Sequence, residues 1–243
     1  MHSPDDLHIG GGRGQGGPFF LPGFRLNAGV GPLARVYIYD IIPVTLGAAL
    51  LAVLQAQTAA VALTLAAGAG VTTEIVNGET RYVLDVPRTV SLTSGGVLSA
   101  GTFTIVGYDV YGQRMTQTLA GPATNTVNTL KAFKSIVSVT PNTTSATTVS
   151  IGIGDTFGLP FAISDVGYVQ AVKWAQTLAP DAGTFVAAVA TDPNTAALGD
   201  VRGTYLPSSA SNGTRRLVMS LALKDVQVSA GATLRGAIGV VPA

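Results

Sequence analysis

The feature that most constrains the fold is a series of short apolar stretches, separated by turn residues, that begins near residue 75. One pair of stretches flanks Asn77-Gly78, a dipeptide that accepts the two positive φ angles of a tight hairpin turn. Phe103 and Ile105 alternate with polar residues, as expected for a strand with one buried face. Further strands are predicted at Thr89–Thr93, Thr102–Val110, Gln113–Leu119, Lys131–Thr140, Thr147–Ile153, Tyr168–Gln176, Thr184–Ala190, Arg216–Leu223 and Leu234–Val241. This spacing predicts an all-β fold, a β-sandwich or jelly-roll-like domain, rather than βαβ units.

The stretch between Asp40 and Glu74 carries no charged residue and is long enough for a membrane-spanning helix. Gln55, Gln57 and Thr58 at its centre disfavour a span, and no basic cluster flanks it. We expect instead one or two helical turns near Leu46–Leu54, followed by a strand at Ala60–Ala66. No membrane partner is predicted.

Residues 1–34 are expected to form an extended arm, because glycine and proline are too frequent there for a regular element. Phe19, Phe20 and Phe24 lie within this arm and are candidate assembly contacts, since three exposed aromatic rings favour docking on another surface. Residues 35–243 are predicted to form the β-rich domain. A boundary near residues 158–165 would divide it into two subdomains.

Charge and residue usage exclude several classes of function. Only 11% of the 243 residues are charged and the net charge is +1, so nucleic-acid binding is not expected. The chain has no cysteine, which excludes disulfides and thiolate chemistry. Its two histidines, His2 and His8, lie in the expected arm, so a histidine-based triad or metal cluster inside the fold is excluded. The amino-terminal residues also lack the pattern of a secretory signal.

The remaining candidates for chemistry have simpler explanations. Gly12 to Gly17 matches G-x-G-x-x-G, but neither a strand before it nor a helix after it is expected, so no dinucleotide cofactor is predicted. Asp5, Asp6 and His8 lack fixed geometry for a metal. Two carboxylates could still act as acid and base in glycoside cleavage. The candidates are Asp109, Asp155, Asp165 and Asp200, which we interpret as turn residues that bond their own backbone. No catalytic, cofactor or metal site is therefore predicted.

Several segments resemble a family of tailed-bacteriophage virion structural proteins. The resemblance is carried by Leu84–Ser94, Ser99–Leu119, Lys131–Val139, Asp200–Ser209 and Asn212–Arg216, within about residues 60–225. It implies a non-enzymatic head decoration or cement protein, located in the virion, that assembles in the bacterial cytoplasm. The implied partners are the major capsid protein or other virion proteins, together with further copies of the chain as a dimer or trimer. The alternatives are a tail, fibre or connector-associated protein and, third, a carbohydrate-binding module or carbohydrate-active enzyme. The arm is not part of the resemblance.

Overall fold

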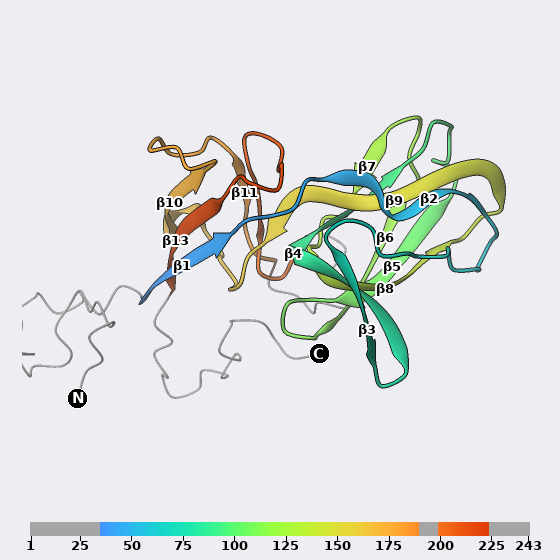
Figure 1. The fold of residues 1–243 in the computed structure, drawn as a ribbon, viewed down its shortest axis with the longest axis horizontal. Coiled ribbons are helices and arrows are strands. Elements are labelled where there is room, and N and C mark those ends of the chain that lie inside the picture. The colour runs from blue at the N-terminus through green and yellow to red at the C-terminus, as the bar shows by residue number, and fades with distance from the viewer. Residues whose placement is uncertain (1–34, 190–198, 224–243) are drawn as a thin grey trace, which may run out of the picture.

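A computed structural model describes residues 35–189 and 199–223 of the chain, which form an all-β fold of large antiparallel sheets (Figure 1). This confirms the predicted fold class. The strands are β1 Arg35–Ile41, β2 Gly47–Gln57, β3 Val71–Val76, β4 Glu79–Thr93, β5 Thr102–Tyr108, β6 Arg114–Ala120, β7 Thr126–Asn128, β8 Phe133–Pro141, β9 Ser145–Gly158, β10 Val169–Trp174, β11 Thr184–Val186, β12 Thr204–Leu206 and β13 Leu217–Leu223. One short 3₁₀ helix, η1, spans Val166–Tyr168.

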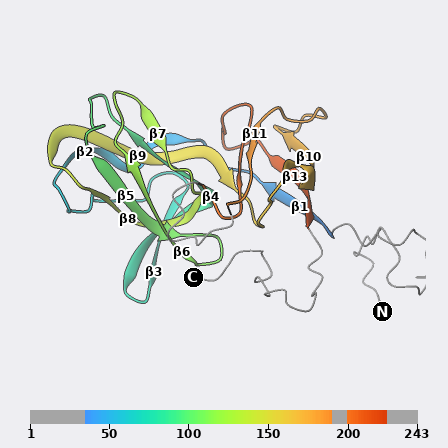
Figure 2. The ribbon, with the colours of Figure 1, turned by 180° about the vertical axis from the view of Figure 1, so that it is seen from behind.

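The strands form a ten-stranded and a three-stranded sheet. The larger sheet has the order β11-β12-β9-β4-β8-β5-β6, and β2 pairs with β9 while β3 and β7 pair with β4. The smaller sheet has the order β1-β13-β10. The views from both sides place the three-stranded sheet at one end of the molecule, which we call the smaller lobe, and most of the larger sheet at the other, the larger lobe (Figures 1 and 2).

Strand β4 connects different parts of the larger sheet because it changes partners along its length. Tyr82 and Val83 pair with β8, whereas residues 90–93 pair with β9. The change occurs at Arg88, which is in register with both Phe133 of β8 and Phe157 of β9. Pro87, which has no N–H to donate to a ladder, immediately precedes this point.

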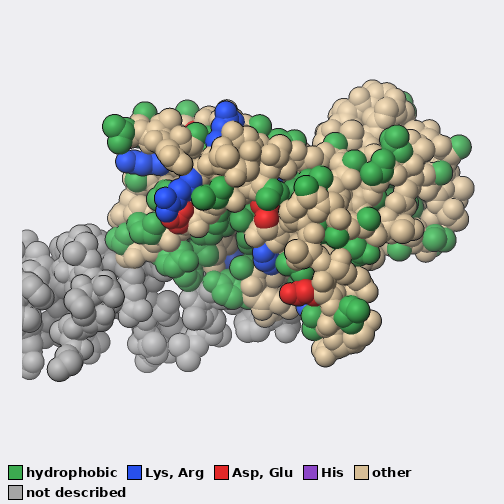
Figure 3. Space-filling view, in the orientation of Figure 1, with side chains coloured by type: hydrophobic (Ala, Val, Ile, Leu, Met, Phe, Trp, Pro, Cys, Tyr) green, Lys and Arg blue, Asp and Glu red, His purple; other side chains and the backbone are tan. Residues whose placement is uncertain are grey.

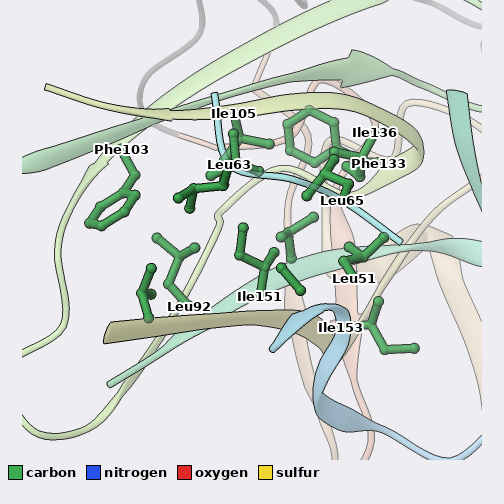
Figure 4. Packing of buried hydrophobic residues seen from close by; sticks show 14 of the residues in the cluster. Leu51, Leu63, Leu65, Leu92, Phe103, Ile105, Phe133, Ile136, Ile151 and Ile153 are labelled. Carbon is green, nitrogen blue, oxygen red and sulfur yellow. The ribbon is translucent and has the colours of Figure 1, made fainter. Parts of the chain in front are cut away.

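Two clusters of buried side chains form the core. The main cluster lies inside the larger lobe and includes Leu51, Leu92, Phe103, Ile136 and Ile151, whose side chains converge in Figure 4. The second cluster lies beneath the three-stranded sheet and contains Tyr39, Val86, Phe157, Leu159, Ile163, Trp174, Tyr205, Leu217, Met219 and Leu221. This second cluster draws residues from both sides of the proposed 158–165 boundary, and the division into subdomains stays a prediction.

The hairpin expected at Asn77-Gly78 is confirmed. β3 and β4 pair up to Val76 and Glu79, and the two residues between them have φ of 52° and 80°. Both angles lie in the left-handed region that a type I′ turn requires.

The helical turns expected near Leu46–Leu54 are wrong: from Gly47 onward this segment belongs to strand β2. β2 pairs irregularly with β9, with register shifts on either side of Ala52. Leu51 and Ala52 are buried in the main cluster, so contacts with β9 decide the conformation of a stretch whose sequence is ambiguous. No helix in the described part of the chain is both long and apolar enough to cross a membrane.

The strand expected at Ala60–Ala66 is also wrong, although the segment does enter the core. Leu63 and Leu65 are buried in the main cluster. Single hydrogen bonds hold the segment: Leu63 N donates to Val139 O (2.9 Å) and Ala66 N to Leu51 O (2.8 Å). In place of strand pairing, the Gln55 amide bonds the backbone of Thr64 twice: Nε2 donates to Thr64 O, and Oε1 accepts from Thr64 N.

Most of the other predicted strands are confirmed with shifted ends. Thr89–Thr93 forms the last part of β4, and the stretches assigned to β5, β6, β8, β10 and β13 each contain the observed strand or most of it. Thr147–Ile153 covers only the middle half of β9. The stretch from Thr184 is a strand only as far as Val186. Strands β1, β7 and β12 were not predicted. Leu234–Val241 and the expected arm lie outside the described residues.

Candidate functional site

Arg88 is the centre of a buried ionic cluster. Its side chain is 0% exposed, and Nε donates to Gly154 O (2.8 Å). Nη2 pairs with Asp155 Oδ1 (2.8 Å) and Nη1 with Asp85 Oδ2 (3.2 Å). The guanidinium carbon also lies 5.2 Å from the centroid of the Phe157 ring. Each charged partner therefore offsets the cost of burying the other.

Asp155 connects this cluster to the loop before β13. Its Oδ2 accepts from the backbone N of Ser211 (2.8 Å), and Ser211 Oγ lies 2.5 Å from Oδ1. Both carboxylate oxygens are thus engaged by residues far away in the sequence. The expectation that Asp155 bonds its own backbone in a turn is wrong, because it lies within β9 and faces Arg88.

Arg202 and Asp109 form a second buried ion pair, with Nη2 and Oδ2 2.5 Å apart. The other oxygen of Asp109 accepts from the backbone N of Tyr111 and of Gln113, both at 2.8 Å. Asp109 therefore holds the β5–β6 turn, as expected, and ties it to Arg202. The Arg202 guanidinium also lies over the Tyr111 ring, 4.9 Å from its centroid.

Asp200 lies beside the same arginine. It accepts from the backbone N of Arg202 and of Ala132, both at 2.9 Å. Burial raises the pKa of the Asp200 carboxyl, and the two N–H donors and Arg202 only partly offset that effect. Asp200 has the expected local turn bond together with a long-range one to Ala132.

Asp165 has the expected turn role. It precedes η1, and its Oδ1 accepts from Gly167 N (2.6 Å) at an exposed position. The structure thus brings Asp109 and Asp200 together at Arg202, places Asp155 at Arg88 and leaves Asp165 at the surface. The described residues contain no group of three or more His, Cys, Asp or Glu that could hold a metal ion.

Sequence reasoning missed Arg88 and Arg202, the two arginines that are buried among the described residues. Arg88 lies within the largely apolar stretch Val86-Pro-Arg-Thr-Val, in a chain with few charges. A charged residue in such a stretch was the feature that could have indicated a buried arginine. All four candidate carboxylates accept donors from the protein itself. This arrangement suits a fixed framework better than acid–base exchange with a substrate.

The most distinctive surface feature is the hairpin of β3 and β4, which projects away from the body of the molecule (Figures 1 and 3). Among the described residues β3 pairs with β4 alone. Ile75, one pair away from the turn, is 76% exposed. The projecting tip therefore presents an aliphatic side chain and an unpaired strand edge.

Side chains from the rest of the fold hold the β4 strand of this hairpin, including Glu79, which follows the turn. The Arg81 guanidinium lies 3.7 Å from the centroid of the Tyr108 ring, and Tyr108 Oη donates to Glu79 Oε2 (2.7 Å). This bond to the Glu79 carboxylate raises the pKa of the Tyr108 hydroxyl. Tyr82 Oη donates to Leu65 O (2.8 Å) on the side of the main cluster. The contacts fix the direction in which the tip points.

Phe19, Phe20 and Phe24, the candidate assembly contacts, lie outside the described residues, and their role stays a prediction. Comparisons of the chain with models of protein families, with curated proteins and with solved structures find no match.

Proposed function

We propose that this chain is a non-enzymatic structural protein of a tailed-phage virion, a head decoration protein that binds the assembled shell. The observation that carries the proposal is the projecting β3–β4 hairpin, whose β4 strand is held by Tyr108 and which exposes Ile75 near its turn. A preformed projection with an exposed aliphatic side chain loses little conformational entropy when it docks in a pocket of a neighbouring protein.

Two further features support a role based on contact. The carboxylates that could have served as acid and base accept hydrogen bonds and ion pairs within the protein. The resemblance to virion structural proteins covers most of the described chain. A protein that binds only the assembled shell stabilises that shell by mass action.

The arm is proposed as a second contact. Phe19, Phe20 and Phe24 could each contribute about 1.5–3 kcal/mol when buried, before the entropy cost of ordering the arm is deducted. Replacing all three with Ser should weaken association with the particle while the β domain stays folded.

A binding experiment tests the role of the hairpin. Purified protein is mixed with phage particles that lack it, and the bound fraction is measured by sedimentation. Ile75→Asp should reduce binding at least about tenfold, because an unpaired charge would be buried at the contact. Val97→Asp is the matched control, since Val97 is similarly exposed, at 65%, and lies outside the hairpin.

Labelling of the particles separates the alternatives. Copies that follow the shell lattice support a decoration protein, whereas a few copies at the tail or connector support the runner-up. Binding that is equal for the wild type and Ile75→Asp would contradict docking through the hairpin. Absence of the protein from particles would contradict the proposed function itself.

A further inference from the structure

The three-stranded sheet has two outer edges, which differ in how far the rest of the chain covers them. On β10, Asp181 N donates to Val172 O (2.9 Å), so the chain itself caps part of that edge. On the other side, β1 pairs with β13 and with no other strand among the described residues. The row of backbone donors and acceptors on the outer edge of β1 is therefore open to a further strand.

The side chains on both faces of β1 show the same incomplete cover. Ile38 faces away from the second cluster and is 54% exposed, with Val36 beside it on that face. Tyr37 has the same parity as the buried Tyr39, yet it is 38% exposed and packs edge to face on Phe161, with ring centroids 4.8 Å apart. A strand beside β1 would cover apolar groups on both faces.

The register places one segment of the chain next to this edge. Arg35 pairs with Leu223, so β13 ends beside the start of β1, and residues 224–243 continue from that point. The sequence predicts a strand at Leu234–Val241, in which Leu234, Ile238 and Val240 share one face. Arg235 is the only charged residue in that stretch.

The linker is long enough for the segment to reach the edge within one chain. Residues 224–233 can span up to about 33–36 Å when extended. The distance from β13 across β1 to a new strand is two strand spacings, about 10 Å. A covalently attached segment also has a high effective concentration at a site it can reach.

We propose that residues 234–241 of the same chain add a fourth strand at the open edge of β1. Leu234, Ile238 and Val240 then extend the second cluster beside Tyr37 and Phe161. The added strand also blocks an edge that would otherwise pair with other chains. This inference does not depend on the proposed function in the virion.

Hydrogen exchange of the β1 amides tests the proposal on the full chain. We compare the wild type with a variant lacking residues 232–243 and with the double substitution Ile238→Asp and Val240→Asp. Both variants should exchange the outward β1 amides about tenfold or more faster, while the amides of β13 stay protected. Ala230→Asp places one charge in the linker and should change nothing.

Three results would overturn this assignment. The first is identical β1 exchange in the wild type and both variants. The second is protection that disappears on dilution of the protein, which would show that a second copy of the chain covers the β1 edge. The third is loss of protection when residues 1–23 are deleted, which would show that the amino-terminal arm covers the β1 edge.

Discussion

Arg88 fixes the point at which β4 changes partners, since it lies in register with both β8 and β9. Its guanidinium also bonds Asp85 on β4 and Gly154 on β9. A buried guanidinium is tolerated only because Asp85, Asp155 and backbone carbonyls satisfy its donors. Removing it leaves two carboxylates without their cation.

We therefore expect Arg88→Met to lower the free energy of unfolding by about 3–5 kcal/mol, because it breaks a buried ion pair. Urea denaturation measures the loss. Arg81→Met is the control, since its pair with Glu79 is partly exposed and is expected to contribute about 0–1 kcal/mol. Similar small losses in both variants would show that the Arg88 cluster does not stabilise the fold. Asp155→Asn added to Arg88→Met should cost less than the two separate losses combined.

Asp181 gives a pH dependence at the residue scale. Partial burial acts to raise the pKa of its carboxyl, but donors from Ser208 and Tyr205 outweigh burial and hold the pKa below its ordinary value of 3.8. Tyr205 Oη donates to Oδ2 at 2.7 Å. A carboxyl whose pKa is lower in the folded state contributes stability above its unfolded pKa and loses it as pH falls through the folded value.

Asp181→Asn should therefore destabilise the protein near pH 7, and its difference from the wild type should shrink as the pH falls below about 4. Thermal unfolding from pH 7 to pH 3 measures the difference. A gap that stays constant over this range would exclude the carboxylate charge as its source. Asp165→Asn is the comparison, as a carboxyl bonded to a single backbone N–H.

At the scale of elements, β2 depends on a close approach of two backbones. A Cβ added to Gly152 would lie 1.9 Å from Gly47 O and 2.5 Å from the carbonyl carbon of Ala48. Glycine on β9 is thus what allows β2 to lie against it. Leu51 and Ala52 enter the main cluster from this strand.

Gly152→Ala should force β2 away from β9 and lower stability by about 1–3 kcal/mol or more, because the contacts are with backbone that cannot give way. Gly95→Ala is the matched control, since nothing lies within 4 Å of its added Cβ, and its effect should stay within about 0.5 kcal/mol. Thermal unfolding followed by circular dichroism compares them. An equal change in both variants would contradict the close approach.

The same elements show what can be predicted from sequence. Asn77-Gly78 specifies its hairpin locally, through two positive φ angles, so it was predictable. The conformation of Leu46–Leu54 depends on Ile151, Gly152 and Ile153, about a hundred residues away, and no local pattern reveals that pairing. The partners of Asp155 are equally distant: Arg88 and Ser211 come from other strands and loops. The hydrophobic periodicity of a segment does not indicate which distant strand or loop that segment contacts.

At the scale of the whole molecule, continuous strands join the two lobes. β9 contributes Ile151 and Ile153 to the main cluster and Phe157 to the second. β4 likewise contributes Val90 to the first and Val86 to the second. Unfolding of β4 or β9 in one cluster therefore disrupts the other cluster as well. We expect the described domain to unfold in one cooperative transition.

The single tryptophan allows a direct measurement. Trp174 is buried in the second cluster, donates from Nε1 to Ser209 Oγ (3.0 Å) and lies 6.1 Å from the Phe157 ring centroid. Its fluorescence reports the smaller lobe, whereas the far-ultraviolet circular dichroism signal is dominated by the larger sheet. The two urea curves should coincide, because Phe157 lies on the strand that continues into the main cluster. A fluorescence change at lower urea would instead show that the smaller lobe unfolds by itself, which the predicted division near residues 158–165 requires. Phe157→Leu sharpens the test: it should shift both curves together if β9 couples the clusters, and only the fluorescence curve if it does not.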